Sequence, residues 1–479
     1  MQQPETEILI TGAGPVGLMM ACQLAVRNIK FRIIDKKTSY PAWSGALLIH
    51  AATLEIFHQL GMSGKIHENA RMIRGVNFSS NGKHIGRLDV SNYGQGLTRF
   101  PYILMLEQSK TEEVMADFLK ELNVKVERET ELIHIADGND GVTLILKSKS
   151  GEEIIHAKYL IAADGGESFV RSKLNIPFNG TTHSETLFTV DGNMSIKLPH
   201  DEILFSFSKE ATAGFFPLSR DRWRIDGTTP WKRKNDITLI NIQKDFSNII
   251  KQNFTLNFAD WFSTFHSHAK ISGILSTDHC FLIGDAAHIF SPVGAQGMNN
   301  GLHDACNLGW KLSMAIEKKA AGIILNSYAT ERKPVVKKIA YITNGLYRFL
   351  SSKGLFIKSL RLYFFPWFMR LFFPLFSQPA VKKWLFNSIS GLGYSYGNRL
   401  VNNGNRLQSL RAGERVPYIN YIENGQISNT RDIITYDHLH LFVFVRDRLD
   451  NSLIILADEY KDQVKTHLFH YNNGTKSIF

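Results

Sequence analysis

The sequence predicts an α/β protein, and three features carry that prediction. First, a glycine-rich turn joins an apolar run at residues 7–11 to an apolar helical pattern that extends to residue 28. Second, apolar runs near residues 160 and 281 each lead through a glycine-containing turn into another helical stretch. Third, residues 178–275 contain runs that alternate apolar and polar side chains, which is typical of an antiparallel sheet with one buried face. A chain of 479 residues is long enough for both kinds of unit.

The composition indicates a globular protein of a reducing compartment. Hydrophobic residues make up 44% of the chain and charged residues 21%, as in ordinary soluble domains. The three cysteines, Cys22, Cys280 and Cys306, form no CxxC pair, which argues against structural disulfides and a zinc site. The first residues contain no basic stretch followed by an apolar run, so we expect no secretory signal. We therefore expect a cytoplasmic protein without a metal site.

The net charge of +11 comes from one segment. From Arg332 to Arg411 the chain has 14 Lys and Arg residues, and no Asp or Glu occurs between Glu331 and Glu414. A local excess of this kind indicates a partner for one surface rather than general binding of nucleic acid. We expect no nucleic-acid partner.

The first glycine-rich turn, "GAGPVG", has the spacing of a dinucleotide-binding turn. Gly12 permits the tight turn, Gly14 lets a pyrophosphate approach the backbone, and Gly17 lets the helix and the strand pack closely. The N-terminus of the following helix offers free N–H groups and a positive dipole end to phosphates. Asp35 ends the next apolar run, where a carboxylate can bind ribose hydroxyls. The turn predicts a nucleotide site without distinguishing FAD from NAD.

Two later turns have a similar construction. The run at residues 157–163 continues into Asp164, two glycines and a helical stretch. The run "CFLIGD" ends in Asp285, after which proline and glycines lead into a helix that begins near Met298. Glycine-rich loops of this kind occur where a backbone comes very close to another molecule. His288, within the third turn, is expected to be a hydrogen-bonded structural residue.

Taken in order, the three turns resemble those of the class A FAD-dependent aromatic hydroxylases, the family of para-hydroxybenzoate and phenol hydroxylases. The similar elements lie between residue 7 and about residue 334, and they include "TLEIFHQLG" (53–61), "LMLEQSKTEEVM" (104–115) and "SYATERKP" (327–334). The resemblance implies that Asp285 binds the ribityl chain of FAD and that the loop Pro292–Asn299 lies against the isoalloxazine ring. It also implies that Asp164 lies near the pyrophosphate and that Gln108 contacts the flavin.

Glycines in the third turn would bring the loop amides and the helix N-terminus near the pyrimidine edge of the flavin. There they can stabilise the negative charge of a reduced ring. On these grounds the predicted cofactor-binding residues are Gly12, Gly14, Pro15, Val16, Gly17, Asp35, Lys36, Gln108, Asp164, Gly284, Asp285, Pro292, Gly294, Gln296, Gly297, Met298 and Asn299.

The chain departs from the family pattern at several positions. Gly45 and Ala52 stand where the family usually has arginines. The first of these arginines normally helps to hold the flavin and, in some members, the nicotinamide cofactor. Its absence leaves the mobility of the flavin and the route of its reduction open. Ala162 and Ala295 stand where glycine is common, which is a smaller departure.

The resemblance implies an FAD-dependent monooxygenase. NAD(P)H reduces FAD as a transient co-substrate, O2 adds at the flavin C4a, and the C4a-hydroperoxyflavin hydroxylates an aromatic or polyketide-like substrate. No catalytic base can be assigned, since His183, Asp191 and His266 are available but no motif selects one of them. Two alternatives stay open: a membrane-associated flavin reductase or dehydrogenase, and a flavoprotein without catalytic turnover.

The expected organisation is a Rossmann-like FAD-binding domain interrupted by a substrate domain. The FAD-binding domain comprises residues 1–72, 100–177 and 276–345, and the inserted antiparallel-sheet domain comprises 73–99 and 178–275. Asn81 and Gly82 mark a hairpin in the first inserted piece. In that architecture Phe215, Phe216 and Pro217 lie on a strand facing the flavin, and Arg224 makes structural contacts on another strand.

Residues 346–409 form a basic, aromatic helical segment with two open interpretations. It is too often interrupted by charge and proline for a membrane-spanning helix. Basic and aromatic residues without acids fit a segment lying on anionic lipid. Lys358, Arg361 and Arg370 do not share one helical face, which favours instead a kinked helical pair packed on the core.

The tail, residues 410–479, resembles the start of the thioredoxin-like C-terminal domain of phenol-hydroxylase relatives, in truncated form. Its runs "HLHLFVFVRD" and "SLIILAD" are predicted strands. It has no cysteine, so a thiol redox role is excluded. A scaffold role or a contact in a homodimer is the expectation.

Overall fold

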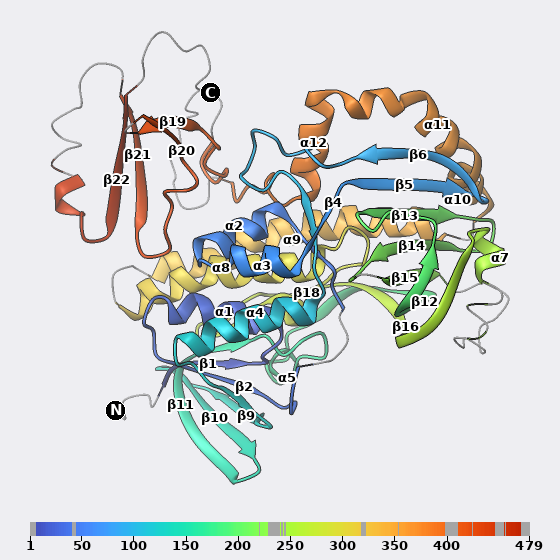
Figure 1. The fold of residues 1–479 in the computed structure, drawn as a ribbon. Helices are drawn as coiled ribbons and strands as arrows, with labels where there is room; N and C mark the ends of the chain where they lie inside the picture. The colour runs from blue at the N-terminus through green and yellow to red at the C-terminus, as the bar shows by residue number, and fades with distance from the viewer. Residues whose placement is uncertain are drawn as a thin grey trace.

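A computed structural model describes most of the chain. Two large sheets dominate the molecule and are connected by long helices (Figure 1). The described residues are 6–40, 45–219, 221–228, 240, 243, 246–317, 322–352, 354–397, 411–423, 425–445, 455 and 457–470.

The first sheet has seven strands in the order β8-β2-β1-β11-β10-β9, with β17 beside β11. Its strands β1, β2, β8, β11 and β17 are parallel, whereas β9 and β10 form an antiparallel edge. The bounds are β1 (Thr6–Thr11), β2 (Phe31–Asp35), β8 (Val126–Arg128), β9 (Glu131–Asp137), β10 (Val142–Ser148), β11 (Gly151–Ala162) and β17 (Cys280–Leu282).

The register of this sheet brings the three predicted turns together. Thr11, the last residue of β1, lies beside Ala162, the last residue of β11. Ala162 in turn lies beside Leu282, the last residue of β17. Because parallel strands end at one edge, the turns that follow these three residues meet there, although they lie far apart in sequence.

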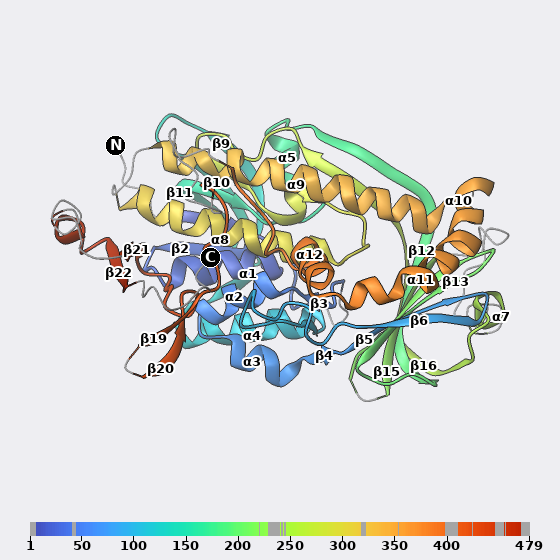
Figure 2. The ribbon, with the colours of Figure 1, turned by 90° about the horizontal axis from the view of Figure 1, so that it is seen from above.

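The helices that follow these turns pack over the sheet. The long helix α8 (Gln296–Ile316) lies against α1 (Pro15–Ala25), which also contacts α4 (Gln108–Glu121). Helix α9 (Gly322–Ser351) passes from the first sheet toward the second, as Figure 2 shows. Shorter elements beside them are α2 (Ala51–Gln59), α3 (Ser63–Asn69), α5 (Phe169–Lys173), and a small sheet of β3 (Leu48–Ile49), β7 (Ile103–Met105) and β4 (Arg71–Ile73).

The second sheet has eight strands in the order β18-β16-β12-β15-β14-β13-β5-β6. All neighbours are antiparallel except β13 and β5, so residues 75–89 join a sheet otherwise made from residues 178–289. The bounds are β5 (Gly75–Ser80), β6 (Lys83–Asp89), β12 (Phe178–Ile196), β13 (Glu202–Phe207), β14 (Thr212–Pro217), β15 (Arg222–Thr228), β16 (Phe254–Ser272) and β18 (His288–Ile289), with the short helix α7 (Ser247–Ile250) alongside.

The predicted hairpin between β5 and β6 is confirmed. Ser80 pairs with Lys83, which leaves Asn81 and Gly82 as a two-residue turn. Both residues have positive φ, 49° and 79°. This is the turn type that matches the twist of antiparallel strands and that selects Asn-Gly.

The basic, aromatic segment folds into a layer of helices over β6 (Figure 1). Helix α10 (Leu355–Ser359) continues through a π-turn (Leu360–Phe364) into α11 (Phe365–Phe372), and a short turn then leads to α12 (Pro379–Ile389). Leu362 and Met369 pack in a cluster with Ile85 and Phe207 of the second sheet. The predicted packing on the core is therefore present. Among the described residues, no helix combines the length and the apolar character needed to cross a membrane.

The tail forms two small two-stranded sheets, β19 (Asn420–Glu423) with β20 (Gln426–Asn429) and β21 (Leu439–Val445) with β22 (Val464–His470). Strand β21 coincides with the first predicted strand. Of the second predicted strand, "SLIILAD" (452–458), the structure describes only residues 455, 457 and 458, and these are helical, so the prediction is wrong for them. The tail is joined to α2 by ion pairs from Arg415 and Arg431 to the buried Glu55. Its likeness to a thioredoxin-like domain stays a prediction.

Candidate functional site

One large cavity, with a volume of about 1240 Å³, extends from the three turns to the second sheet. At one end it is lined by the turns after β1, β11 and β17, and by residues beyond β2. At the other end it is lined by β5, β13, β14 and β15, and by α11 and α12. We refer to these as the turn end and the sheet end.

The first turn presents bare backbone to the cavity. A methyl group added to Gly12, whose φ is +96°, would lie 2.3 Å from the Ala163 carbonyl oxygen. A methyl group added to Gly17 would lie 1.9 Å from the Gly12 oxygen. Gly14 has no atom within 4 Å of such a methyl group, and it lines the cavity with Pro15 and Val16. Since no side chain among the described residues caps α1, its first N–H groups remain available to an anion there.

Asp35 is fixed in place at the edge of the cavity. Its two carboxylate oxygens accept hydrogen bonds from the backbone N–H groups of Ala13, at 2.7 Å, and of Lys37, at 2.8 Å. The guanidinium of Arg128 lies 3.5 Å from the same carboxylate and over the ring of Tyr40. A carboxylate held in this way can present its remaining lone pairs to hydroxyl groups.

The second turn carries a carboxyl with spare hydrogen-bonding capacity. Asp164 Oδ2 accepts a hydrogen bond from Val170 N at 3.2 Å, whereas Oδ1 is buried and has no partner among the described residues. Burial raises the pKa of Asp164. Arg171 donates to the Gly166 and Ala286 carbonyl oxygens, so it ties the second turn to the third.

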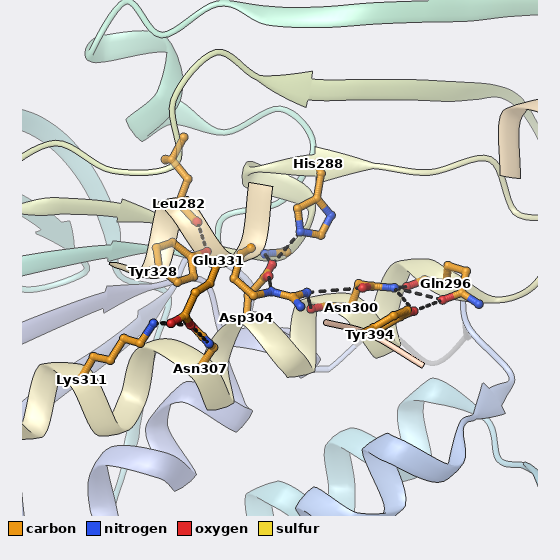
Figure 3. Close-up of polar contacts among 12 residues, drawn as sticks. Leu282, His288, Gln296, Asn300, Asp304, Asn307, Lys311, Tyr328, Glu331 and Tyr394 are labelled. Carbon is orange, nitrogen blue, oxygen red and sulfur yellow. Dashed lines mark hydrogen bonds and ion pairs between the residues drawn. The ribbon is translucent and has the colours of Figure 1, made fainter. Parts of the chain in front are cut away.

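A buried network of charged side chains holds the third turn in place. Asp304 accepts hydrogen bonds from Gly284 N at 3.0 Å, from His288 Nε2 at 2.6 Å and from Arg332 Nε at 2.7 Å (Figure 3). Although burial alone would raise the pKa of Asp304, His288 and Arg332 hold it at about 2. The expected structural role of His288 is confirmed. Asp285 itself lines the cavity, to which its side chain is exposed, and the protein packed around it raises its pKa.

The loop before α8 also presents backbone to the cavity. Gly294 and Ala295 have positive φ, +85° and +52°, and within the described part of the chain no side chain caps the helix. An alanine in this conformation costs about 1 kcal/mol, which the usual glycine would avoid. Pro292, Gly297 and Met298 line the cavity too, and Gly297 has open space beside it.

Gln296 lines the cavity, but its side chain is engaged in holding the loop. Its Oε1 accepts hydrogen bonds from Tyr394 Oη at 2.8 Å and Asn300 Nδ2 at 3.0 Å (Figure 3). Its Nε2 donates to the Ile389 carbonyl oxygen. These contacts join the loop to the end of α12.

Three of the predicted cofactor-binding residues do not line the cavity: Gly17, Gly284 and Asn299. The Asn299 side chain bonds to His50 N, Thr53 Oγ1 and the Leu48 carbonyl oxygen, so it fixes the segment before α2 against α8. Their direct contact with a cofactor stays a prediction. Of the other predicted residues, Lys36 and Gln108 both line the cavity, and Gln108 Oε1 accepts a hydrogen bond from Ala46 N.

An arginine does lie beside Gly45, but it comes from the second sheet. Arg224 Nη1 donates to the Gly45 carbonyl oxygen at 3.2 Å. The same guanidinium forms two hydrogen bonds of 2.6 Å to Asp191, and both side chains are buried. The predicted structural role of Arg224 is confirmed, and it brings to this position a charge that Asp191 balances. Ala52 stands at the other position where the family usually has an arginine. Its backbone N–H donates to the Ser390 carbonyl oxygen.

The sheet end is lined mainly by aromatic side chains. They include Phe78, Phe205, Phe207, Phe216 and Phe365. The prediction for β14 was therefore right only for Phe216. Phe215 points to the opposite face of the sheet, into a separate core cluster with Trp223, and Pro217 does not line the cavity. Successive side chains of a strand point to opposite faces of the sheet, so Phe216 faces the cavity whereas Phe215 and Pro217 do not.

None of the three candidate bases named from sequence lines this cavity. Asp191 is paired with Arg224, the ring of His183 packs 4.3 Å from that of Tyr347, and His266 is exposed on β16. The cavity instead contains Asp226, on the same face of β15 as Arg224. Burial raises the pKa of Asp226, and the nearby Arg224 partly offsets that effect.

Sequence reasoning also missed His50, which lines the turn end and whose pKa is lowered by burial to about 4. For Asp226 a weak signal existed. In "RWRIDGT" it alternates with Arg224, so a half-buried strand places both on one face. Nothing in the sequence says that this face meets a cavity.

Comparison with known proteins fits this geometry. A family model described as "FAD binding domain" matches residues 5–343. A Bacillus subtilis protein named as an uncharacterized aromatic compound monooxygenase is 30% identical over 437 residues, which are 88% of this chain and 84% of the relative. The chain belongs to the family of FAD-dependent aromatic hydroxylases. As a member of that family it is a flavoprotein monooxygenase with FAD as its cofactor.

Solved structures of other hydroxylases share the fold of this family member. The OxyS anhydrotetracycline hydroxylase from Streptomyces rimosus superposes with a TM-score of 0.78 at 26% identity, covering 98% of this chain and 91% of the other. A ternary complex of aklavinone-11 hydroxylase with FAD and aklavinone gives a TM-score of 0.81 at 18% identity, covering 98% and 89%, and shows likeness of fold alone.

The turn end fits FAD on its own chemistry. It offers open space at Gly14, two uncapped helix N-termini, a buried unpartnered oxygen on Asp164, and the positioned carboxylate of Asp35. These groups suit the phosphates, the hydroxyls and the polar ring edge of such a cofactor.

Proposed function

We propose that the protein hydroxylates an aromatic, polyketide-like compound, with NAD(P)H as reductant and O2 as oxidant. The observation that carries this proposal is one continuous cavity, which joins the glycine-rich turn end to a sheet end that contains many aromatic side chains. Relatives with similar sequences are named anhydrotetracycline monooxygenase, 28% identical, and pentachlorophenol 4-monooxygenase, 26% identical.

The residues that would hold FAD follow from the turns. Gly12, Gly14 and the N-terminus of α1 suit the pyrophosphate, and Asp35 suits the adenosine ribose. Asp285 suits the ribityl chain. The loop Pro292–Met298 suits the isoalloxazine ring, because its backbone and the N-terminus of α8 can hold negative charge.

When bound, FAD supplies the redox chemistry that activates O2. The chain's own part is to orient the substrate and to exclude water. Phe78, Phe205 and Phe216 form an apolar wall that suits a flat, fused-ring molecule. Such a wall also keeps water from the reacting carbon.

We assign to Asp226 the role of base for the hydroxyl group of the substrate. It is the carboxyl on the face of β15 that lines the cavity. A carboxyl whose pKa is raised by burial is a stronger base than an exposed one. By accepting the hydroxyl proton, it would increase the electron density of the aromatic ring and fix the ring's orientation.

The test is to purify the protein and to measure its visible spectrum, NADPH oxidation and O2 uptake. Anhydrotetracycline and pentachlorophenol serve as probes, with a broader panel of fused-ring phenols. We expect a yellow protein in which an aromatic compound stimulates NADPH oxidation and gains one oxygen atom. Product formation without O2 would support a reductase or dehydrogenase instead, and bound FAD without any NADPH oxidation would indicate a non-catalytic flavoprotein.

A further inference from the structure

The helices α10, α11 and α12 have two apolar faces rather than one. Their inner face packs on the second sheet, where Leu362 and Met369 meet Ile85 and Phe207. Phe365, Met369 and residues of α12 also line the cavity. The inner face therefore has its partner within the molecule.

The outer face is apolar and exposed. Leu355 and Phe356 are 83% and 79% exposed, Trp367 is 56% exposed and Trp384 is 67% exposed. Single exposed apolar residues are normal in proteins, but a contiguous group of large ones marks an interaction site. We call this group the aromatic face; it consists of Leu355, Phe356, Tyr363, Phe364, Trp367, Leu371, Leu375 and Trp384.

The spacing of four of these residues, in α10, the π-turn and α11, places them in one stripe. Phe356, Tyr363, Trp367 and Leu371 follow one another at intervals of seven, four and four residues along one nearly continuous helix. Residues at such intervals lie on the same side of a helix. The outer stripe is therefore a continuous property of α10 and α11.

Within the segment that carries the aromatic face the charge has one sign, and the neighbouring Asp89 of β6 lies close enough to Lys382 to interact with it. Arg370 and Lys383 are exposed beside the aromatic face, Lys358 and Lys382 are half-buried, and the chain has no acid between Glu331 and Glu414. Arg361, which made the basic residues look scattered in sequence, is buried and donates to the Phe349 and Leu350 carbonyl oxygens at the end of α9. Arg361 therefore does not contribute to the charge of the surface, where Lys358 and Arg370 still lie on different sides of the helix.

We propose that the aromatic face docks the protein on the surface of a membrane containing anionic lipid. Exposed Trp, Tyr, Phe and Leu side chains with a basic surround suit a helix lying in the interface plane. A second copy of the chain fits less well, since a symmetric contact would bring Arg370 and Lys383 of both copies together without acids from this segment. The docking is independent of the chemistry proposed for the cavity.

The experiment is co-sedimentation of the full chain with vesicles. One set is phosphatidylcholine alone and the other is equal parts of phosphatidylcholine and phosphatidylserine. We expect binding at least about tenfold stronger to the mixed vesicles, weakening as salt is raised, because each basic residue near the surface adds attraction. Equal binding to both sets, or no binding, would overturn the proposal.

Two variants with matched controls locate the contact. W367S/W384S should lose binding, whereas I422S/I427S, which removes equally exposed apolar residues of β19 and β20, should keep it. R370E/K383E should lose the preference for anionic lipid, whereas K125E, at an exposed site on the first-sheet side of the chain, should keep it. The flavin spectrum and the Tm of each variant check that it is folded.

A different outcome would identify another occupant. If light scattering shows a concentration-dependent dimer that W367S/W384S abolishes, and vesicles do not bind, the aromatic face is a self-association surface and the proposal is wrong. Vesicle binding requires no substrate and no turnover. A failure of the proposed hydroxylation would therefore leave this result unaffected, and the reverse also holds.

Discussion

The turn end and the sheet end of the cavity are built in different ways. At the turn end, Gly12, Gly14, Gly294 and Gly297 leave backbone groups open to the cavity beside several polar side chains. At the sheet end, the groups facing the cavity are side chains from strands and helices far apart in sequence. The turn end can therefore accept one fixed cofactor, whereas the sheet end can change its ligand by single substitutions without altering the fold.

This difference has an energetic counterpart. Behind the turn end lies the charged network of Asp304, His288 and Arg332, in which each group is buried. Behind the sheet end lies an apolar cluster containing Phe215, Trp223 and Phe246. Changes near the turn end should therefore reduce stability and cofactor binding together, and changes at the sheet end should alter activity alone.

The largest expected effect is that of Asp304→Asn, which leaves Arg332 buried without its counter-charge. The free energy of unfolding should fall by about 4 kcal/mol, as when other buried ion pairs lose one partner. Urea titration at pH 7 measures the change. Asp278→Asn, at an exposed site, should change it by less than about 0.5 kcal/mol.

The same variant has a distinct pH dependence. The pKa of Asp304 is lowered to about 2, so its contribution is complete above the unfolded-state pKa near 4 and is lost as the pH falls toward 2. The difference in stability between the two proteins should therefore shrink by about 2 kcal/mol over that range. A constant difference would show that Asp304 is not held ionised.

Gly12→Ala should have the next largest effect and should lower the free energy of unfolding by about 3 kcal/mol. The added methyl group meets the Ala163 carbonyl oxygen, and the φ of +96° disfavours alanine. The variant should also lose FAD, which its visible absorbance reports. Gly64→Ala, a helical glycine with open space around it, should keep both stability and FAD. Retention of FAD by Gly12→Ala would contradict the proposed position of the pyrophosphate.

Asp226→Asn tests the sheet end. We expect kcat/KM to fall about 100-fold, the lower range for loss of a general base, while Tm and the flavin spectrum are unchanged. Because the pKa of Asp226 is raised, the wild-type rate should decrease as the pH is lowered through that pKa, and the variant should lack this decrease. Asp221→Asn, exposed at the start of the same hairpin, is the matched control.

The smallest effect is expected for Tyr394→Phe, which removes the hydrogen bond donated to Gln296 and a longer one accepted from Asn300. Stability should fall by about 1 kcal/mol. Tyr460→Phe, at an exposed site, should change nothing measurable in thermal unfolding. If Tyr394→Phe weakened FAD binding more than Gly12→Ala does, the turn end would depend on side chains as much as on backbone. The turn end and the sheet end would then not differ in the way described.

Sequence reasoning succeeded where one local segment contains the whole signal. The Asn81-Gly82 hairpin and the turn beginning at Gly12 are cases of this kind, since backbone conformation is set by a few adjacent residues. It failed for Phe215 and Asp226, because alternation shows that two faces exist without showing which face meets the cavity. It also could not foresee that Arg361 turns inward, since the carbonyl groups that it satisfies belong to another helix.

By itself, then, the sequence determined the three turns and the presence of two sheet types, because glycine spacing and side-chain periodicity act over short distances. Only the tertiary structure decided that Thr11, Ala162 and Leu282 end at one edge and that β5 pairs with β13. It also decided that Asp226 faces the cavity while Trp367 and Trp384 face outward. These facts depend on pairing register and packing between distant segments, which no local pattern encodes.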